Sequence, residues 1–441
     1  ARRMTMAQNA ETATLAPRGR TAAAARLLRR AAAPAALALL LFVSVGRGDA
    51  IGALDRATAP YQRDLVLWEA SHFLDKWGHR IASIGDDDDA EARRAAVDEF
   101  FSLREPLARA RQDLSAALAA GDDGDAQAML ADARAIEQRR AELQPVVEEA
   151  IEAAVSASLL ELEVIDALGP LRWPPVDFTF AQGGLVLVRS PRDRVERLTD
   201  RLLRADVDLL SQAVLEERVE ADDDGMSALV VRIGGVATYP AHVTPNAALH
   251  PTLALVVHEW MHHWLIFRPL GRAWWQGGEL TSINETLADI VAEEAGDLAL
   301  FKLTGQRVER PPWQPPAAQP APDPNPDVFD FNRFMRETRV RLDALLAEGR
   351  VAEAEVWLEE RRLGLQERGV PLRKLNTAYF AFYGTYAGDP RGGGVNPIDG
   401  QLRTLRAAAP SLAAFVDQVA RIDRPGELEE AARAAGWRPA P

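Results

Sequence analysis

The run from Pro251 to Phe267 is apolar on almost every side of the helix that it predicts, yet it contains four ionisable side chains. A helix that is apolar all round is buried, and polar or charged groups are costly inside a protein unless partners compensate them. The four side chains are His258, Glu259, His262 and His263. Their presence in a buried helix calls for a compensating ion, and hydrogen-bonded core histidines are the alternative.

The spacing H-E-x-x-H at His258, Glu259 and His262 favours a metal ion. Residues four apart lie one above the other on one helix face, so both imidazoles can reach the same ion while Glu259 stands beside it. A tetrahedral ion also requires a third protein ligand and an open position for water. Glu259 can then accept the proton of a water molecule that attacks a carbonyl group.

Two downstream carboxylates, Glu285 and Asp289, can complete such a site. Ser282 precedes Glu285 at the spacing of a capping box, which predicts a second helix over 282–295. Because Glu285 and Asp289 are four residues apart, both face the same way. One can bind the metal while the other accepts a hydrogen bond from a ligand histidine. Glu279 is an alternative ligand, although its Gly-Gly context suits a loop better than a helix.

These residues resemble the gluzincins, zinc peptidases of the thermolysin and aminopeptidase N type, in which H-E-x-x-H is followed on a second helix by E-x-x-x-D. The resemblance implies a Zn²⁺ ion bound by His258, His262 and Glu285. It also implies that Glu259 is the general base and that Asp289 supports His258. Peptide hydrolysis is implied by the family, because the same metal and base can cleave another amide or an ester.

A donor for the oxyanion of the transition state is expected in the aromatic stretch from Leu375 to Tyr386. This stretch is similar to a group of uncharacterised bacterial predicted aminopeptidases that end in an Asn-rich segment and a Thr-Tyr pair. We expect Tyr386 first and Tyr383 second as the catalytic donor. Aromatic core packing is the alternative role for both.

The best strand in the sequence runs from Ala228 to Thr238, just before the predicted metal helix. A peptidase of this class carries an edge strand at that place, which pairs with an extended substrate. Gly234 and Gly235 would let a substrate backbone approach closely. A buried structural strand is the alternative.

The sequence predicts a mostly helical α+β fold, with a zincin-like catalytic core that holds a small sheet. The expected parts are a signal peptide or signal-anchor (1–50), a helical stalk or hairpin region (51–170), the catalytic core (171–310), a Pro-rich linker (311–328) and a C-terminal helical lobe (329–441). Further expected elements are strands over 177–180 and 184–188 and helices over 191–215, 332–346 and 351–365.

Composition limits the chemistry and the partners of the chain. Its 441 residues include no Cys, which excludes disulfides and thiolate metal sites, so that histidines and carboxylates must hold any metal. The formal net charge of -14 argues against nucleic acid as a partner, because phosphate binding needs a concentrated basic surface. Peptides or proteins are the expected substrates.

The N-terminal segment predicts export or membrane attachment. Several arginines between Arg18 and Arg30 precede an uncharged run from Ala31 to Val45, as in a basic n-region followed by an apolar h-region. A cleaved signal and a membrane anchor both fit this pattern. In either case the remainder of the chain is expected outside the cytoplasm, secreted or attached to the membrane.

Two other functions compete with a peptidase. A catalytically inactive, zincin-like helical adaptor at the membrane would retain the scaffold without turnover, but the intact Glu259 argues against it. A pure interaction protein with a coincidental motif would bind no stoichiometric zinc.

Overall fold

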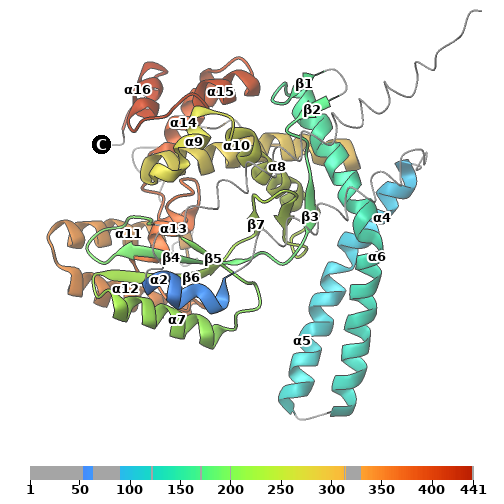
Figure 1. Cartoon of the computed structure of the whole chain (residues 1–441), viewed down its shortest axis with the longest axis horizontal. Helices are drawn as coiled ribbons and strands as arrows, with labels where there is room; N and C mark the ends of the chain where they lie inside the picture. Colours follow the sequence, from blue (N-terminus) through green and yellow to red (C-terminus); the bar gives the residue numbers. More distant parts are fainter. Residues whose placement is uncertain are drawn as a thin grey trace, which may run out of the picture. The chain divides into compact units, whose positions relative to one another are not determined.

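Helices make up most of the structure, and short strands form a minor part of it (Figure 1). The computed structural model describes residues 53–62, 90–120, 123–168, 171–198, 200–311, 313 and 329–439. The mostly helical α+β class expected from the sequence is confirmed for these residues. The predicted signal or anchor at 1–50 and most of the Pro-rich segment 311–328 lie outside the described residues.

Three long helices, α4, α5 and α6, account for most of the described residues between 90 and 161. The described helices are α2 (Ala53–Thr58), η1 (Ala59–Tyr61), α4 (Ala90–Ser102), α5 (Arg104–Ala120), α6 (Asp123–Glu161), α7 (Leu209–Asp222), α8 (Leu249–Leu265), α9 (Pro269–Arg272), η2 (Ala273–Gln276), α10 (Gly278–Thr304), α11 (Phe331–Ala347), α12 (Val351–Glu367), α13 (Thr377–Tyr383), η3 (Pro390–Gly392), α14 (Ile398–Ala408), α15 (Leu412–Val419) and α16 (Glu427–Ala434). None of the helices in the described ranges combines the length and the apolar composition that crossing a membrane requires.

The strands that the structure describes form three small sheets. They are β1 (Asp166–Leu168), β2 (Leu171–Trp173), β3 (Phe178–Phe180), β4 (Leu185–Pro191), β5 (Arg201–Leu203), β6 (Met226–Arg232), β7 (Gly235–Val236) and β8 (Ala241–Val243). β1 and β2 form an antiparallel hairpin. In the sheet β3-β8-β7, β8 is parallel to β3 and antiparallel to β7, whereas the sheet β5-β4-β6 is antiparallel throughout.

Helices cover both faces of the β5-β4-β6 sheet. On one face, Val186 and Val188 of β4 pack in a core that α11, α12 and α13 complete. On the other face, Leu185 and Leu187 pack against α7. Since successive strand residues point to opposite faces, this two-sided cover explains why the first four residues of β4, Leu185 to Val188, are all apolar.

The helix predicted over 191–215 is wrong for most of its length. Pro191 ends β4, and a turn and an irregular segment lead into β5, so that α7 begins only at Leu209. Val195 and Leu202 have helical spacing in the sequence, but they contact the core from the irregular segment and from β5. Pairing of β5 with β4 therefore overrides the local helical pattern.

Other predicted elements agree with the structure, apart from their ends. The predicted strands over 177–180 and 184–188 are β3 and β4, and the predicted helices over 332–346 and 351–365 are α11 and α12. The single strand expected over 228–238 is divided into β6 and β7, which belong to different sheets. This division leaves the two-residue β7 close to the helix that carries the H-E-x-x-H motif.

A pair of buried glutamates on α6 fixes β3 in place. Glu148 Oε1 accepts hydrogen bonds from the Phe180 N–H at 2.7 Å and from the Thr179 hydroxyl at 2.9 Å. Glu152 Oε1 accepts a hydrogen bond from the Phe178 N–H at 3.0 Å. Because β3 is at the edge of its sheet, these carboxylates satisfy backbone donors that have no strand partner on that side.

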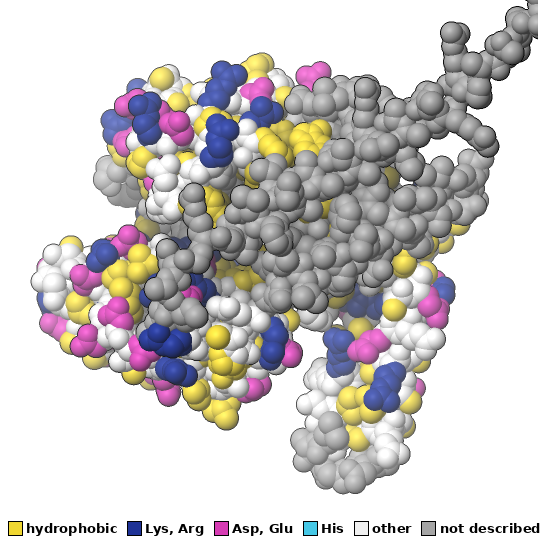
Figure 2. Space-filling model, in the orientation of Figure 1, with side chains coloured by type: hydrophobic (Ala, Val, Ile, Leu, Met, Phe, Trp, Pro, Cys, Tyr) yellow, Lys and Arg dark blue, Asp and Glu magenta, His cyan; other side chains and the backbone are white. Residues whose placement is uncertain are grey.

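Acidic and basic side chains are interspersed over the described part of the face in Figure 2. Many of them form surface ion pairs, for example Arg139 with Glu99 at 2.6 Å. Exposed pairs of this kind contribute little to stability. The stability of the fold is therefore expected to depend mainly on the buried contacts described above.

Replacement of Glu148 by Ala should lower the free energy of unfolding by about 1–3 kcal/mol, because the Phe180 N–H would be left buried without an acceptor. Urea denaturation followed by circular dichroism measures this change. Glu142→Ala is the control, since the Glu142 side chain is 52% exposed and its pair with Arg139 lies at the surface. An equal effect of the two substitutions would contradict the role of Glu148.

Candidate metal centre

Close packing of α8 against α10 brings the site together. A β-carbon built on Gly296 of α10 would lie 3.1 Å from the α-carbon of Ala254 on α8, so the two helices cross almost backbone to backbone there. His258 is one turn beyond Ala254, and Asp289 is about two turns before Gly296. The crossing therefore places side chains from the two helices within reach of each other.

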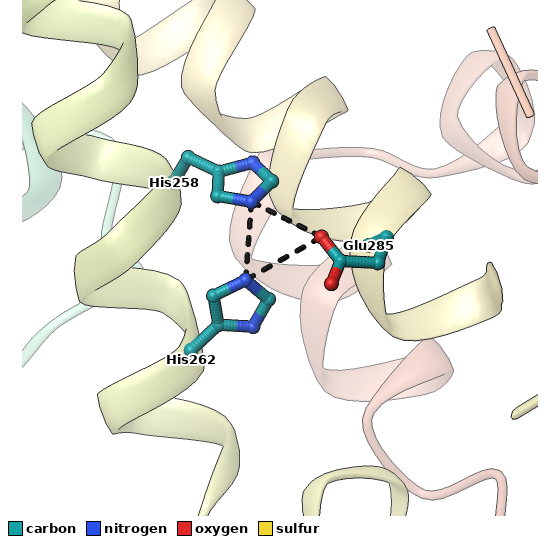
Figure 3. A group of neighbouring side chains, drawn as sticks. All are labelled: His258, His262 and Glu285. Atoms are coloured by element: carbon teal, nitrogen blue, oxygen red, sulfur yellow. Dashed lines mark hydrogen bonds and ion pairs between the residues drawn. The ribbon is translucent and has the colours of Figure 1, made fainter. Parts of the chain in front are cut away.

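His258 and His262 extend from α8 toward Glu285 on α10 (Figure 3). The two Nε2 atoms are 3.1 Å apart. Glu285 Oε2 lies 3.2 Å from Nε2 of His258 and 3.6 Å from Nε2 of His262. The three side chains His258, His262 and Glu285 thus form one group that can hold a metal ion, which is called the metal group.

The other ring nitrogen of each histidine is held by a residue of α10. His258 Nδ1 lies 2.9 Å from Oδ1 of Asp289, as the sequence predicted. His262 Nδ1 lies 3.0 Å from Oδ1 of Asn284, which sequence analysis did not identify. Since both oxygens accept, each Nδ1 carries a proton, and each Nε2 can present its lone pair to a metal ion at the centre of the group.

Three atoms with lone pairs therefore converge in a buried place. Glu285 Oε2 is buried and accepts no hydrogen bond of good geometry from any described residue. A tetrahedral ion with bonds of about 2.0–2.2 Å would have edges of about 3.3–3.6 Å between ligand atoms. The observed separations of 3.1, 3.2 and 3.6 Å lie within about 0.2 Å of this range, which is the tolerance for a metal site.

The charges in the group favour a cation at its centre. Burial opposes the charged form of His258, but Asp289 and Glu285 outweigh it and raise the pKa of His258 well above its ordinary value. Burial also opposes ionisation of Glu285, but His262 and His258 hold its pKa well below the ordinary range. A positive charge between the carboxylate and the rings is therefore stable, whether a proton or a metal ion supplies it.

Glu259 lies beside the group and is in contact with β7. The side chain of Glu259 is only 5% exposed. A β-carbon built on Gly235 would lie 2.1 Å from Glu259 Oε1, so a side chain at this position of β7 would displace the Glu259 carboxylate. Burial raises the pKa of Glu259, and the neighbouring His258 and His262 partly oppose that increase.

His263 does not belong to the metal group, in contrast to the expectation that a single ion compensates all the ionisable residues of the helix. Its Nε2–H donates to the carbonyl oxygen of Thr238 at 2.8 Å. Burial lowers the pKa of His263 to about 4, so the ring is neutral at pH 7. His263 instead ties the segment after β7 to α8.

Glu279 does not join the metal group. Helix α10 begins at Gly278, so Glu279 is in its first turn and Ser282 is not the N-cap that the capping-box pattern predicted. Oε1 of Glu279 accepts a hydrogen bond from the Gly426 N–H at 3.0 Å. The Gly-Gly sequence that suggested a loop provides two positive φ angles, 71° at Gly277 and 59° at Gly278, immediately before the helix.

The two predicted tyrosines have different surroundings. The Tyr386 ring centroid lies 6.4 Å from that of His258. Burial, and then the charge of Glu285, raise the pKa of Tyr386 well above its ordinary value, so its phenol remains protonated and can donate. Tyr383 instead packs against Tyr379, with ring centroids 4.6 Å apart, and under the guanidinium of Arg391.

A tryptophan that sequence analysis did not assign lies next to the group. The rings of Trp274 and His262 meet edge to face, with centroids 5.6 Å apart. Trp274 is in η2, which follows α8 and α9 and is joined to α10 by Gly277. Its position in a connecting segment gives no periodic signal that could have identified it from sequence.

The chain was compared with family models, curated proteins and solved structures. None of these comparisons gave a match. Functional inference therefore depends on the geometry of the site.

Replacement of Asn284 by Ala or of Asp289 by Ala should weaken metal binding by about 10–100-fold, because each leaves one ligand imidazole without its orienting acceptor. Competition with a chromogenic chelator measures the affinity. Glu279→Gln is the control, since Glu279 binds a backbone N–H away from the metal group. Loss of metal from Glu279→Gln, with unchanged affinity in the other two variants, would contradict this assignment of ligands.

Proposed function

We propose that the protein is a zinc-dependent peptidase of the gluzincin kind. The observation that carries the proposal is the convergence of His258, His262 and Glu285 beside the buried carboxylate of Glu259. Two imidazoles and one carboxylate are a ligand set of catalytic zinc sites, in which a fourth position remains open. The absence of Cys from the sequence leaves this donor set as the natural one for zinc.

Glu259 is the general base in this proposal. When bound, zinc would polarise the substrate carbonyl and increase the acidity of a water molecule. Glu259 accepts the proton of the attacking water and can later transfer it to the leaving amine. Its buried position and raised pKa support this role, because a stronger base accepts the proton more readily.

Support for a peptide substrate comes from the free edge of β7. β7 is at the edge of its sheet, and the Thr244 N–H donates to the carbonyl oxygen of Gly234. In an antiparallel pair, hydrogen-bonded and non-hydrogen-bonded residues alternate. The N–H and C=O of the next residue, Gly235, therefore point away from β8. An extended peptide can pair with these groups next to Glu259. Such pairing would place a peptide bond beside the base and the metal group.

Tyr386 is the proposed oxyanion donor. Its ring lies beside His258 and its phenol remains protonated, as described above. A neutral donor of this kind stabilises the negative charge that develops on the carbonyl oxygen. The surroundings of Tyr383 give no comparable support, since that ring contacts Tyr379 and Arg391.

Glu259→Gln should retain zinc and lose about 10²–10⁴-fold in kcat, because the amide cannot accept the proton of water. The measurement is digestion of a peptide library by zinc-loaded protein, followed by mass spectrometry, with zinc content determined in parallel. A chelator should abolish cleavage, and added zinc should restore it. Zinc binding without any cleavage by the parent protein would favour the inactive adaptor instead.

Gly235→Ala should reduce kcat by at least about tenfold without releasing the metal, because the added methyl group collides with Oε1 of Glu259 and displaces the base. Gly234→Ala is the matched control, since a β-carbon there meets its nearest neighbour, Leu255, at an ordinary 3.5 Å. Steady-state rates of the two variants test this difference. Equal rates would show that the close approach at Gly235 is unimportant for turnover.

A further inference from the structure

A largely buried arginine outside the metal group, Arg197, has its guanidinium held on two sides. Its Nε and Nη2 donate to Oδ2 of Asp200 at 2.9 and 2.5 Å. The ring of Phe382 lies against the guanidinium, with its centroid 5.0 Å from Cζ. The Arg197 side chain is only 15% exposed, so its orientation is fixed by these contacts.

The remaining nitrogen of this group has no acceptor. Nη1 of Arg197 is buried and makes no hydrogen bond to any described residue. Buried donors in proteins are almost always paired, so an unpaired one requires an explanation. Because Asp200 occupies the Nε–Nη2 edge, Nη1 is the guanidinium nitrogen left without a partner among the described residues.

Aromatic contacts connect Arg197 to the metal group. The Phe382 ring that contacts Arg197 lies 5.7 Å from the Tyr386 ring, and the Tyr386 ring lies 6.4 Å from that of His258. Burial opposes the charge of Arg197, but Asp200, Tyr386 and Glu285 outweigh it and raise the pKa of the guanidinium. Arg197 is therefore a cation that is connected to the metal group through the rings of Phe382 and Tyr386.

A second arginine, Arg189 on β4, also has an unpaired donor but does not belong to the same place in the fold. Its Nε is also buried without a hydrogen-bond partner among the described residues. Its guanidinium interacts electrostatically with Asp223 and Asp200. Successive strand residues point to opposite faces, so Arg189 points with Leu185 and Leu187 to the α7 face, whereas Arg197 packs against Phe382 on the other face. The inference therefore rests on Arg197 alone.

We propose that Nη1 of Arg197 binds the C-terminal carboxylate of a peptide, so that the enzyme acts close to the C-terminus of its substrates. The inference rests on the proposed peptidase function and specifies its substrate class. Arg197 is a specificity-determining residue, and Asp200 and Phe382 position its guanidinium. An ionised carboxylate is the peptide group that best matches a charged donor in a buried place.

Paired libraries of N-acetylated dipeptides, made as free acids and as C-terminal amides, test this specificity. Each library is equilibrated with zinc-loaded Glu259→Gln protein, and the retained peptides are quantified by mass spectrometry. We expect the acids to be retained on the order of a hundredfold more tightly than the amides. The doubly neutral variant Arg197→Gln/Asp200→Asn, which leaves no unpaired buried charge, should lose this preference.

Arg194→Gln is the matched control, because Arg194 is 58% exposed and pairs with Glu196 at the surface. It should retain the preference for acids. Equal retention of acids and amides by the Glu259→Gln protein would overturn the proposal, and so would an unchanged preference after Arg197 and Asp200 are neutralised. Because the assay measures binding, it is independent of hydrolysis. A preference for acids in a protein that cleaves no peptide would refute the peptidase and keep the carboxylate site.

Discussion

The close crossing of α8 and α10 at Ala254 and Gly296 is the constraint on which the site depends. Small residues let the two backbones approach, and the ligands of both helices then meet within hydrogen-bond distance of each other. A β-carbon at residue 296 would already require α8 to give way by a few tenths of an ångström, which is about the tolerance of metal–ligand distances. The ligand geometry is therefore a consequence of helix packing as much as of the motif itself.

Hydrogen bonds from neighbouring residues orient the buried histidines of α8. Asp289 and Asn284 fix the two ligand imidazoles, while His263 binds the carbonyl oxygen of Thr238 and so holds the segment that follows β7. Each contact offsets part of the free-energy cost of burying an ionisable ring in an apolar helix. The orientation of the imidazoles, and of the strand beside Glu259, thus arises from the same set of buried hydrogen bonds.

The sequence alone predicts those site residues that recur at helical spacing. His258, His262, Glu285 and Asp289 follow helical spacing, and the structure brings all four together. The sequence does not single out Asn284, because a residue directly beside the ligand Glu285 follows no recognised spacing of metal-site residues. The segment 191–215 was assigned to a helix because its apolar residues have helical spacing, although strand pairing with β4 determines its structure. Long-range pairing of this kind leaves no signal in a single sequence.

The outer edges of β6 and β7 differ among the described residues of the two three-stranded sheets. Side chains occupy the outer edge of β6. Glu220 and Glu216 accept from the N–H groups of Ala228 and Val230, and Asn376 and Arg373 donate to their carbonyl oxygens. Such occupation prevents another strand from pairing. At β7 the backbone N–H and C=O of Gly235 point away from β8. The space that a β-carbon of Gly235 would fill is occupied by the carboxylate of Glu259. The missing β-carbon at that position therefore serves two purposes, because it makes room for the base and leaves the edge open beside it.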